Sequence, residues 1–299
     1  MDSAVIGIDV GGTRTKGVAL SRTGDILAED TRPTESVDAA ARLGPAIGAQ
    51  VDALAHQVGG PVAHVGVAVP GLVDEARGLG VWSANLGWRD LDLTATLAPH
   101  LPAPVTIGHD VRAGLLGEHR LGAARGQDNV CFVPLGTGIA AALLCRGQIV
   151  RGNPWTGEIG HVTVDSNGID CGCGRQGCLE TLVGGAAMAR LWKHETGSDG
   201  GAAAIAHFVA EGNPVAAGIW MRGITALADV LAPILAANGT DLLVMGGGLS
   251  QAGDVLTEPL QLALRERLGA APLEIVIAQL GDRAGALGAA VLAGDLAWA

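Results

Sequence analysis

The sequence predicts an α/β protein whose two lobes face each other across a cleft. At 299 residues the chain is longer than the usual single domain, so two lobes of about 100–200 residues each are expected. Short β-branched runs and segments of helical periodicity follow one another along the chain, as in α/β folds. A strand, glycine turn and strand near the N-terminus recur around residue 136, which favours a duplicated domain with a cleft between its halves.

The first lobe is predicted from the N-terminal third of the chain. A β-branched run meets Gly11 and Gly12 and then resumes, which is typical of two antiparallel strands joined by a tight turn. Apolar residues next recur at helical spacing, and two further strand-like runs follow. We expect a hinge between the lobes near residue 110. The predicted elements are strands at residues 4–10, 16–20, near 26, 65–69 and 105–107, and a helix from 36 to 58.

The second lobe is predicted to begin with the other strand-turn-strand unit, which spans residues 129–145. Most of the chain beyond it has helical periodicity, interrupted by one strand that ends in Gly246-Gly247-Gly248. The predicted elements are helices at residues 179–196, 214–238, 254–268 and about 284–296, and a strand at 242–245.

Charge and hydropathy exclude two classes of partner. The 19 Lys and Arg against 30 Asp and Glu give a net charge of −11, whereas phosphate backbones require clustered cations, so we expect no nucleic-acid partner. No apolar run reaches the roughly 18 residues that span a bilayer, and Asp2 is followed almost at once by a strand-like segment instead of a signal peptide. We therefore expect a cytoplasmic protein with no membrane partner.

The segment from Asp9 to Lys16 is the first candidate for chemistry. Glycines let backbone N–H groups approach an anion, and a carboxylate at a strand end can hold hydrated Mg²⁺, as a nucleoside triphosphate requires. An ordinary glycine hairpin is the alternative. Two later glycine turns suit other parts of a nucleotide, although neither matches the Walker P-loop or the GxGxxG dinucleotide motif. The candidate nucleotide-binding residues are Asp9, Gly11, Gly12, Thr13, Lys16, Gly136, Thr137, Gly138, Gly247 and Gly248.

The second candidate is a zinc site. His161 is followed by Cys171, Cys173 and Cys178, and three thiolates with one imidazole complete a tetrahedral Zn²⁺ sphere. Because four protein ligands leave no open position for a water, we assign the metal a structural role. The alternative is an ordinary histidine near three reduced thiols.

Asp110 is the third candidate. It follows a predicted strand and precedes a predicted helix, so its carboxylate is expected at the carboxyl end of a strand, where α/β sheets form their binding sites. One carboxylate that accepts the proton of an attacking hydroxyl is what phosphoryl transfer requires. A helix N-cap is the alternative role for Asp110.

Five motifs, in order along nearly the whole chain, resemble those of the ROK family, which includes bacterial glucokinases. The most specific are Gly157-Glu158-Ile159-Gly160-His161 and the block that runs from Cys171 to Glu180. The other three are Asp9-x-Gly11-Gly12-Thr13, Leu135-Gly136-Thr137-Gly138-Ile139 and Gly246-Gly247-Gly248.

The resemblance implies a two-lobed actin-like or ribonuclease-H-like ATPase fold. The small lobe would comprise residues 1–110 with about 284–299, and the larger lobe residues 111–283. The resemblance also implies ATP-dependent phosphorylation of a hexose hydroxyl, with Mg²⁺ bound beside ATP. A homodimer or a homotetramer is the implied assembly.

Carried over by matching position, the resemblance makes Asp110 the general base. Carboxylates and amides pair with vicinal hydroxyls and so reject analogues that lack them. His161 would bind zinc with one ring nitrogen and the sugar with the other. The implied sugar ligands are Asn85, Asp110, Glu158, His161 and Glu180, and the residues around the phosphates and Mg²⁺ are Asp9, Gly11, Gly12, Thr13, Thr137 and Gly138.

The chain departs from the family pattern at two places. Glucokinases of this family usually have Asn before the catalytic Asp as a further sugar contact, and this chain has His109. A neutral imidazole offers one donor and one acceptor along a ring, so the acceptor stays open between glucose, mannose, an N-acetylhexosamine and a cyclitol. Residues 140–142 are alanines in place of glycines, which removes no backbone donor, so ATP binding is expected to survive. Polyphosphate is the alternative donor.

Sugar-responsive repressors of the same family are the alternative from another functional class. They carry an N-terminal helix-turn-helix, whereas the phosphate hairpin of this chain begins at Asp9, which leaves no room for one. A further alternative is a sugar sensor that has lost catalysis. The presence of both Asp9 and Asp110 argues against this alternative. A sugar kinase is the predicted function.

Overall fold

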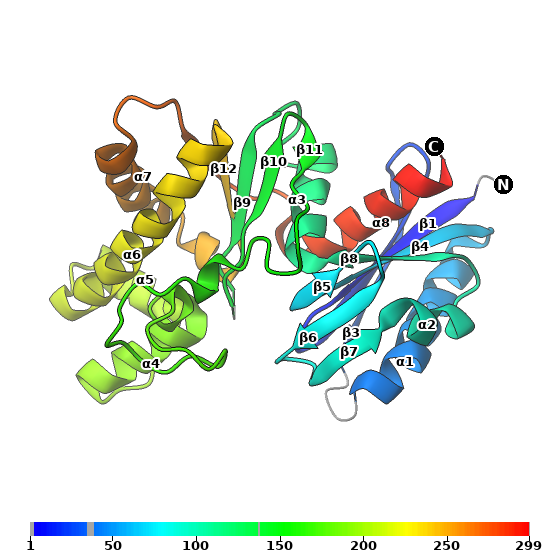
Figure 1. Cartoon of the computed structure of the whole chain (residues 1–299), viewed down its shortest axis with the longest axis horizontal. Helices are drawn as coiled ribbons and strands as arrows, with labels where there is room; N and C mark the ends of the chain where they lie inside the picture. The colour runs from blue at the N-terminus through cyan, green and yellow to red at the C-terminus, as the bar shows by residue number, and fades with distance from the viewer. Residues whose placement is uncertain (1–2, 35–38, 137, 299) are drawn as a thin grey trace. The chain divides into compact units, whose positions relative to one another are not determined.

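The computed structural model describes residues 3–34, 39–136 and 138–298. They form a mixed α/β protein whose strands belong to three sheets (Figure 1). The chain divides into two compact units. Unit 1 consists of Met1–Arg125, Arg151–Thr156 and Asp282–Ala299, and unit 2 of Gly126–Val150 and Gly157–Gly281.

Unit 1 is built on a five-stranded sheet. The strand order is β3 (Ile26–Pro33), β2 (Arg14–Leu20), β1 (Ala4–Val10), β4 (Val62–Val69) and β8 (Val105–His109). A smaller antiparallel sheet contains β5 (Leu72–Asp74), β6 (Leu79–Ser83) and β7 (Trp88–Asp92). The helices are α1 (Ala39–Val58), α2 (Leu93–Leu97), α3 (Asp110–Leu121) and α8 (Ala284–Ala297).

Alternate residues of β1 face two different layers. Ile6 and Ile8 are buried in a hydrophobic cluster with residues of α1, whereas Gly7 lies against α8 on the other face, as the period of a strand requires. A side chain at Gly7 would overlap the carbonyl oxygen of Ala286, and one at Gly288 would overlap that of Ala113 on α3. Helix α8 therefore packs backbone to backbone on β1 and α3, because glycines stand at these contacts.

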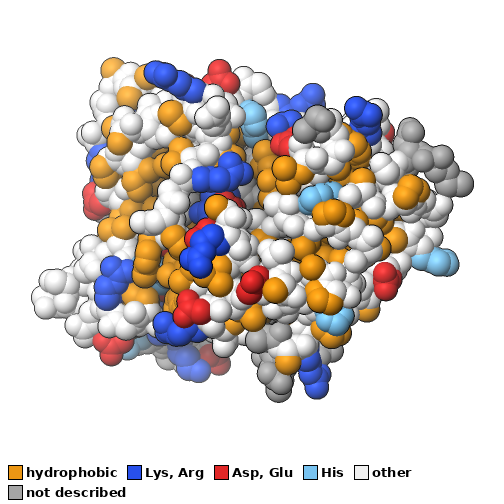
Figure 2. Space-filling view, turned by 45° about the vertical axis from the view of Figure 1, so that its right-hand side comes forward, with side chains coloured by type: hydrophobic (Ala, Val, Ile, Leu, Met, Phe, Trp, Pro, Cys, Tyr) orange, Lys and Arg blue, Asp and Glu red, His pale blue; other side chains and the backbone are white. Residues whose placement is uncertain are grey.

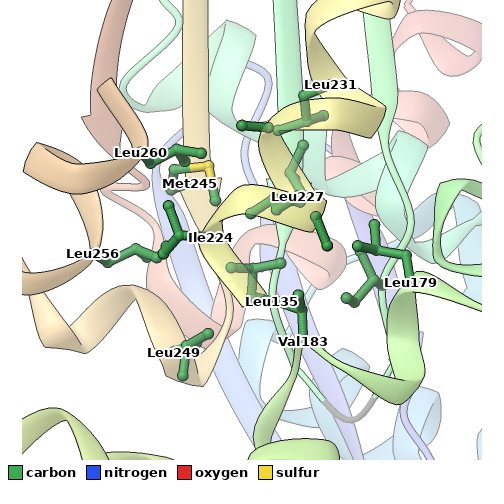
Figure 3. Packing of buried hydrophobic residues seen from close by; sticks show 14 of the residues in the cluster. Leu135, Leu179, Val183, Ile224, Leu227, Leu231, Met245, Leu249, Leu256 and Leu260 are labelled. Atoms are coloured by element: carbon green, nitrogen blue, oxygen red, sulfur yellow. The ribbon is translucent and has the colours of Figure 1, made fainter. Parts of the chain in front are cut away.

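Unit 2 is built on a second five-stranded sheet. The strand order is β11 (Gln148–Ile149), β10 (Ala142–Cys145), β9 (Val130–Pro134), β12 (Leu242–Gly246) and β13 (Glu274–Ile277). The helices are α4 (Gly185–Thr196), α5 (Ala202–Ala210), α6 (Pro214–Asn238) and α7 (Asp254–Leu268). Figure 3 shows Leu227 and Leu231 of α6 close to Leu260 of α7 and Met245 of β12 in the core of this unit.

Helix α6 is the only described helix long and apolar enough to cross a membrane by length and composition. Within that apolar stretch 61% of the residues are buried inside the protein, and Trp220, Leu227 and Leu231 belong to the hydrophobic core of unit 2. Its apolar character thus serves core packing in this structure. On the face drawn in Figure 2, basic and acidic side chains lie interspersed among polar and apolar ones.

Most predicted elements occur, with shifted ends. The hairpin of β1 and β2 is antiparallel, with Asp9 opposite Lys16. The first predicted helix begins at Ala39, since residues 36–38 lie outside the described part of the chain. The helix predicted from residue 179 is wrong at its start: α4 begins at Gly185, because Gly184 adopts a φ of 104° that no helix allows. The sheet of β5–β7 and helix α5 were not predicted.

The contacts divide the chain after Arg125, whereas the sequence predicts a hinge near residue 110. Helix α3 starts at Asp110 and packs on α8 through Gly288, so the whole helix is part of unit 1. A second feature invisible in the sequence is the return of residues 151–156 to unit 1 between two segments of unit 2.

Candidate functional site

The turn between β1 and β2 carries the first group of candidate residues. Gly11 N donates to Arg14 O at 3.0 Å, and the Thr34 hydroxyl donates to Gly11 O at 2.7 Å. A side chain at Gly11 would come within 2.8 Å of Arg14 O, so this tight turn requires glycine. Gly12 and Thr13 are exposed at its tip, where their backbone N–H groups are accessible to an anion.

Asp9 lies at the end of β1, and its surroundings alter its ionisation. Burial, followed by the negative charge of Asp110, raises the pKa of Asp9 to about 7, although Lys16 opposes the shift. A side chain at Gly285 would come within 2.6 Å of the Asp9 carboxylate, so this carboxylate lies against the first turn of α8. A divalent cation beside Asp9 would favour the ionised form.

Lys16 and Asn85 have different positions near this turn. Lys16 Nζ lies 2.7 Å from the carbonyl oxygen and 3.2 Å from the carboxylate of Asp282, so it is held by the segment that leads into α8. Asn85 is exposed on the turn between β6 and β7, and its Cβ lies close to Gly12. The structure therefore brings Asn85 next to the candidate phosphate turn.

Asp110 begins α3 at the carboxyl end of β8. The N-cap is His109, whose Nδ1 accepts a hydrogen bond from Val111 N at 3.2 Å, so Asp110 is the first residue of the helix and not its cap. Asp110 Oδ1 accepts from the same N–H at 2.7 Å, which fixes the orientation of the carboxylate. The Asp110 side chain is 32% exposed, whereas that of His109 is 3% exposed. The carboxylate is therefore accessible and oriented.

Three charged residues near the start of α3 carry no sequence signal strong enough to predict their cluster. Glu75, Arg112 and Arg151 form a cluster in which the Glu75 carboxylate pairs with both arginines. The available sequence signal was Arg112, a charged residue among the apolar and small residues that follow Asp110 in α3; the structure buries it. Glu75 and Arg151 lie on loops, and nothing in their local sequence pairs them.

The two other glycine turns lie side by side in unit 2. Leu135 N donates to Gly246 O at 2.9 Å, and a side chain at Gly247 would overlap Leu135 O. Gly247 also has a φ of 77°, which favours glycine. Gly185 N, at the start of α4, donates to Gly136 O at 3.2 Å. Thr137 lies outside the described residues, while Gly138 is exposed.

The four predicted zinc ligands come together in unit 2. One ligand atom from each of His161, Cys171, Cys173 and Cys178 lies within 4.8 Å of all the others. The sulfurs of Cys173 and Cys178 are 3.7 Å apart, as are Cys171 Sγ and His161 Nδ1. Because a tetrahedron with arms of about 2.3 Å has edges of about 3.8 Å, the residues fit a zinc ion.

The thiols of this cluster differ in acidity. Burial alone would raise the pKa of Cys173, but hydrogen bonds from Arg175 and from the neighbouring thiols outweigh burial and lower the pKa to about 6. Burial and the nearby Glu180 raise the pKa of Cys171. Cys173 is thus the thiol best prepared to bind a cation, because the thiolate is the ligand.

Glu158 and Glu180 lie on either side of the His161 ring. Nε2 of His161 lies 3.8 Å from Glu158, and Nδ1 lies 3.4 Å from Glu180. Glu180 Oε1 also accepts from the Cys171 thiol at 3.0 Å. Two predicted sugar ligands therefore flank the imidazole of a third, His161, which also belongs to the candidate metal cluster. The core residues Leu135, Leu179 and Val183 anchor the backbone next to Gly136 and Glu180 (Figure 3).

Comparison with known proteins gives the same picture over nearly the whole chain. Residues 5–295 match the model of the ROK family. A glucokinase of Thermotoga maritima is 32% identical over 309 residues, which cover 96% of each chain. A kanosamine kinase of Amycolatopsis mediterranei is 32% identical over 303 residues, which cover 98% of this chain and 96% of that one.

Among solved structures, a ROK family glucokinase of Streptomyces griseus in complex with glucose and AMPPNP has a TM-score of 0.82. It is 28% identical, and the match covers 98% of this chain and all of that one. This agreement confirms the predicted two-lobed actin-like ATPase fold.

Proposed function

The chain belongs to the ROK family, and we propose that it is an ATP-dependent kinase that phosphorylates a hydroxyl of a hexose or a hexose-like polyol. Glucokinase and kanosamine kinase relatives, together with a neighbour that binds glucose and AMPPNP, support an ATP-dependent sugar kinase. The observation that carries the proposal for this chain is the pair Asp9 and Asp110. Both carboxylates lie at the ends of strands of one sheet and influence each other electrostatically.

Asp110 is the general base in this proposal. Its Oδ1 is held by Val111 N at 2.7 Å, so the carboxylate is oriented before the acceptor arrives. It accepts the proton of the attacking hydroxyl as the oxygen bonds to the γ-phosphorus and the bond to ADP breaks. Most of the remaining barrier is lowered by positioning and by neutralisation of phosphate charge.

Asp9 and the glycine turns bind the nucleotide in this proposal. Mg²⁺ beside ATP would be held by Asp9, and it would neutralise charge on the transferred group. Backbone N–H groups of two glycine turns contact phosphate oxygens. The third glycine turn lies against the adenosine. The residues assigned to the turns are Gly11, Gly12, Thr13, Gly136, Thr137, Gly138, Gly247 and Gly248, and Lys16 is assigned to the nucleotide site with them.

Six residues are assigned to recognition of the acceptor in this proposal. We assign Glu158, His161 and Glu180, which cluster in unit 2, and Asn85, His109 and Asp110 of unit 1. Carboxylates in such a set pair with vicinal hydroxyls and discriminate against analogues that lack them. His109 uses Nδ1 to cap α3, so it presents fewer hydrogen-bonding atoms to an acceptor than an amide would.

His161, Cys171, Cys173 and Cys178 would hold a structural zinc ion. Its four ligands leave no site for a substrate water, so it supplies rigidity and not Lewis-acid chemistry. Nδ1 of His161 faces the Cys171 sulfur, and Nε2 faces Glu158. A metal bound at Nδ1 would therefore fix the imidazole ring that orients Glu158, one of the predicted sugar ligands. We further propose a cytoplasmic homodimer or homotetramer, which light scattering of the purified protein would test.

An ADP-release assay with Mg-ATP and a panel of hexoses, N-acetylhexosamines, amino sugars and cyclitols tests the proposal. We expect turnover above the ATPase background for at least one acceptor, because the phosphoryl-transfer residues are present. Turnover with glucose would place this chain with the glucokinases, and turnover with another acceptor alone would point to His109 as the cause. No acceptor-dependent ADP release across the panel would contradict the proposed function and favour a sensor.

A further inference from the structure

A buried ion network lies directly behind Asp110 in unit 1. Glu75, on the turn after β5, accepts a hydrogen bond from the backbone N–H of His109 through Oε1 at 2.8 Å. Its Oε2 lies 3.1 Å from Nε of Arg112 and 3.2 Å from Nε of Arg151. The side chains of Glu75 and Arg112 are only 14% and 5% exposed. One carboxylate thus contacts the residue that precedes Asp110 and an arginine one turn further into α3.

The same network holds both ends of the segment 151–156. Arg151, the first residue, pairs with Glu75. Thr156, the last residue, accepts a hydrogen bond through its carbonyl oxygen from Nη1 of Arg112 at 3.0 Å. Between them Asn153 closes a turn: its side chain accepts from Trp155 N at 2.9 Å and its carbonyl from Thr156 N at 2.9 Å. The segment is therefore fastened to the start of α3 at two points.

Stability alone does not explain this arrangement. Removing two charges from water costs several kcal/mol per ion, and replacing a buried pair by apolar residues is often neutral or stabilising. Buried ion pairs do restrict neighbouring groups to one geometry. Here the restricted groups are the His109 amide, directly before Asp110, and the Thr156 carbonyl, two residues before Glu158.

We propose that Glu75 is a positioning residue for phosphoryl transfer. Through the His109 amide and Arg112 it fixes the turn that carries Asp110, and through Arg151 it fixes the segment that leads into Glu158. This inference rests on the proposed function, because it assigns Glu75 to the geometry of the general base. A misplacement of about 1 Å at a reacting group costs about 100-fold in rate, so a residue that acts only through others matters here.

The test compares Glu75→Gln with a matched control, Asp295→Asn. Asp295 pairs with Arg120 at 3.1 Å at the far end of the same helix α3, and both side chains are about half exposed. Each variant converts an arginine-paired carboxylate into an amide. For each variant we would measure kcat, the KM values for ATP and acceptor, and amide hydrogen exchange.

We expect Glu75→Gln to lower kcat about 10- to 100-fold with KM for ATP changed by less than about twofold. Amide exchange should accelerate together in residues 105–113 and 151–156, because both are fastened by one carboxylate. Asp295→Asn should leave kcat and both exchange regions as in the wild type. In an Asp110→Asn background, Glu75→Gln should have little further effect on kcat, since a positioning residue acts through the base.

The outcomes separate the two proposals. Unchanged exchange in both segments, or an unchanged kcat in an active enzyme, would overturn the role of Glu75 while leaving the kinase intact. A wild type that phosphorylates no acceptor would overturn the proposed function and the positioning role together, whatever the exchange shows. If Glu75→Gln fails to fold, Arg151→Gln replaces it, because Arg151 is half exposed. That variant should lower kcat about two- to fivefold and release residues 151–156, and wild-type values for both would overturn the inference.

Discussion

At the residue scale, the ionisation of Asp9 would determine when the proposed nucleotide site can bind Mg²⁺. Its carboxylate lies at the end of β1 against the first turn of α8 at Gly285, and the negative charge of Asp110 acts on it. In the absence of a cation, these surroundings raise the pKa of Asp9 to about 7, so a group that is ionised in the unfolded chain at neutral pH stays partly protonated in the folded protein. The same surroundings would make Asp9 a strong ligand once a divalent cation balances the charge.

We predict a pH-dependent loss of stability in the nucleotide-free protein. Because the pKa of Asp9 is raised from 3.8 to about 7, the folded state binds more protons than the unfolded state between those values, so stability falls as pH rises through that window. The full effect is on the order of a few kcal/mol above pH 7. Asp9→Asn should remove this dependence and be more stable than the wild type at pH 8.

Thermal unfolding from pH 4 to pH 8 in EDTA checks this prediction. The difference in Tm between wild type and Asp9→Asn isolates Asp9, because the other carboxylates titrate in both proteins. Adding Mg-ATP should reverse the order at pH 8, since only the wild type offers the carboxylate. Parallel Tm curves for the two proteins would show that Asp9 ionises normally.

For single residues, the sequence predicted the position of a side chain more clearly than its role. A strand followed by a helix placed Asp110 at the carboxyl end of β8, and it left the choice between base and N-cap open. The structure gives the cap to His109, which removes that alternative use of the Asp110 carboxylate. Which of two adjacent polar residues caps a helix depends on backbone dihedrals, and those were not visible in the sequence.

At the scale of the elements, the loop that carries the predicted zinc ligands has little regular secondary structure. His161 ends a short 3-10 helix, Ile159–His161, and Cys178 immediately precedes another, Leu179–Thr181. Between them the chain is held by single bridges, such as Thr163 with Cys178 and Asp170 with Gln176. A metal ion would add cross-links where ladders of backbone hydrogen bonds are short.

We predict that Cys173→Ser lowers zinc affinity by more than about 100-fold, because it removes the ligand with the lowest thiol pKa of the cluster, about 6. Its Tm should fall as well, since the loop loses its cross-link. Competition with a chromophoric chelator and thermal unfolding measure both effects. Cys145→Ser is the matched control, because Cys145 is a free thiol outside the cluster. Equal zinc affinity in the two variants would contradict the metal assignment.

Local patterns predicted the elements that have strong local signals. The β1–β2 hairpin follows from two β-branched runs around a glycine pair, and α6 follows from a long apolar helix that starts after an Asn cap and ends before Gly239. The strands of β5–β7 have three to five residues each, too short for a clear period. Helix α5 is rich in alanine, and its apolar face is hard to recognise from so few large residues.

For the whole molecule, the order of the motifs along the sequence indicated the family. It did not predict which residues far apart in the chain contact each other. The order of motifs from Asp9 to Gly248 was sufficient to indicate the ROK family, which the family comparison confirms. The return of residues 151–156 to unit 1 depends on Glu75 and Arg112, which lie about 40 to 75 positions away in the chain. Such contacts have no local signature, so neither the unit boundaries nor this network could be derived from spacing.

The proposed role of Asp110 as the base of an ATP-dependent sugar kinase is tested most directly by one substitution. With the best acceptor of the panel, kcat of Asp110→Asn would be measured against the wild type, and acceptor affinity would be measured by calorimetry. We predict a fall in kcat of at least about 100-fold, with acceptor affinity within about fivefold because Asn keeps a hydrogen-bonding oxygen. A kcat close to that of the wild type would contradict the claim.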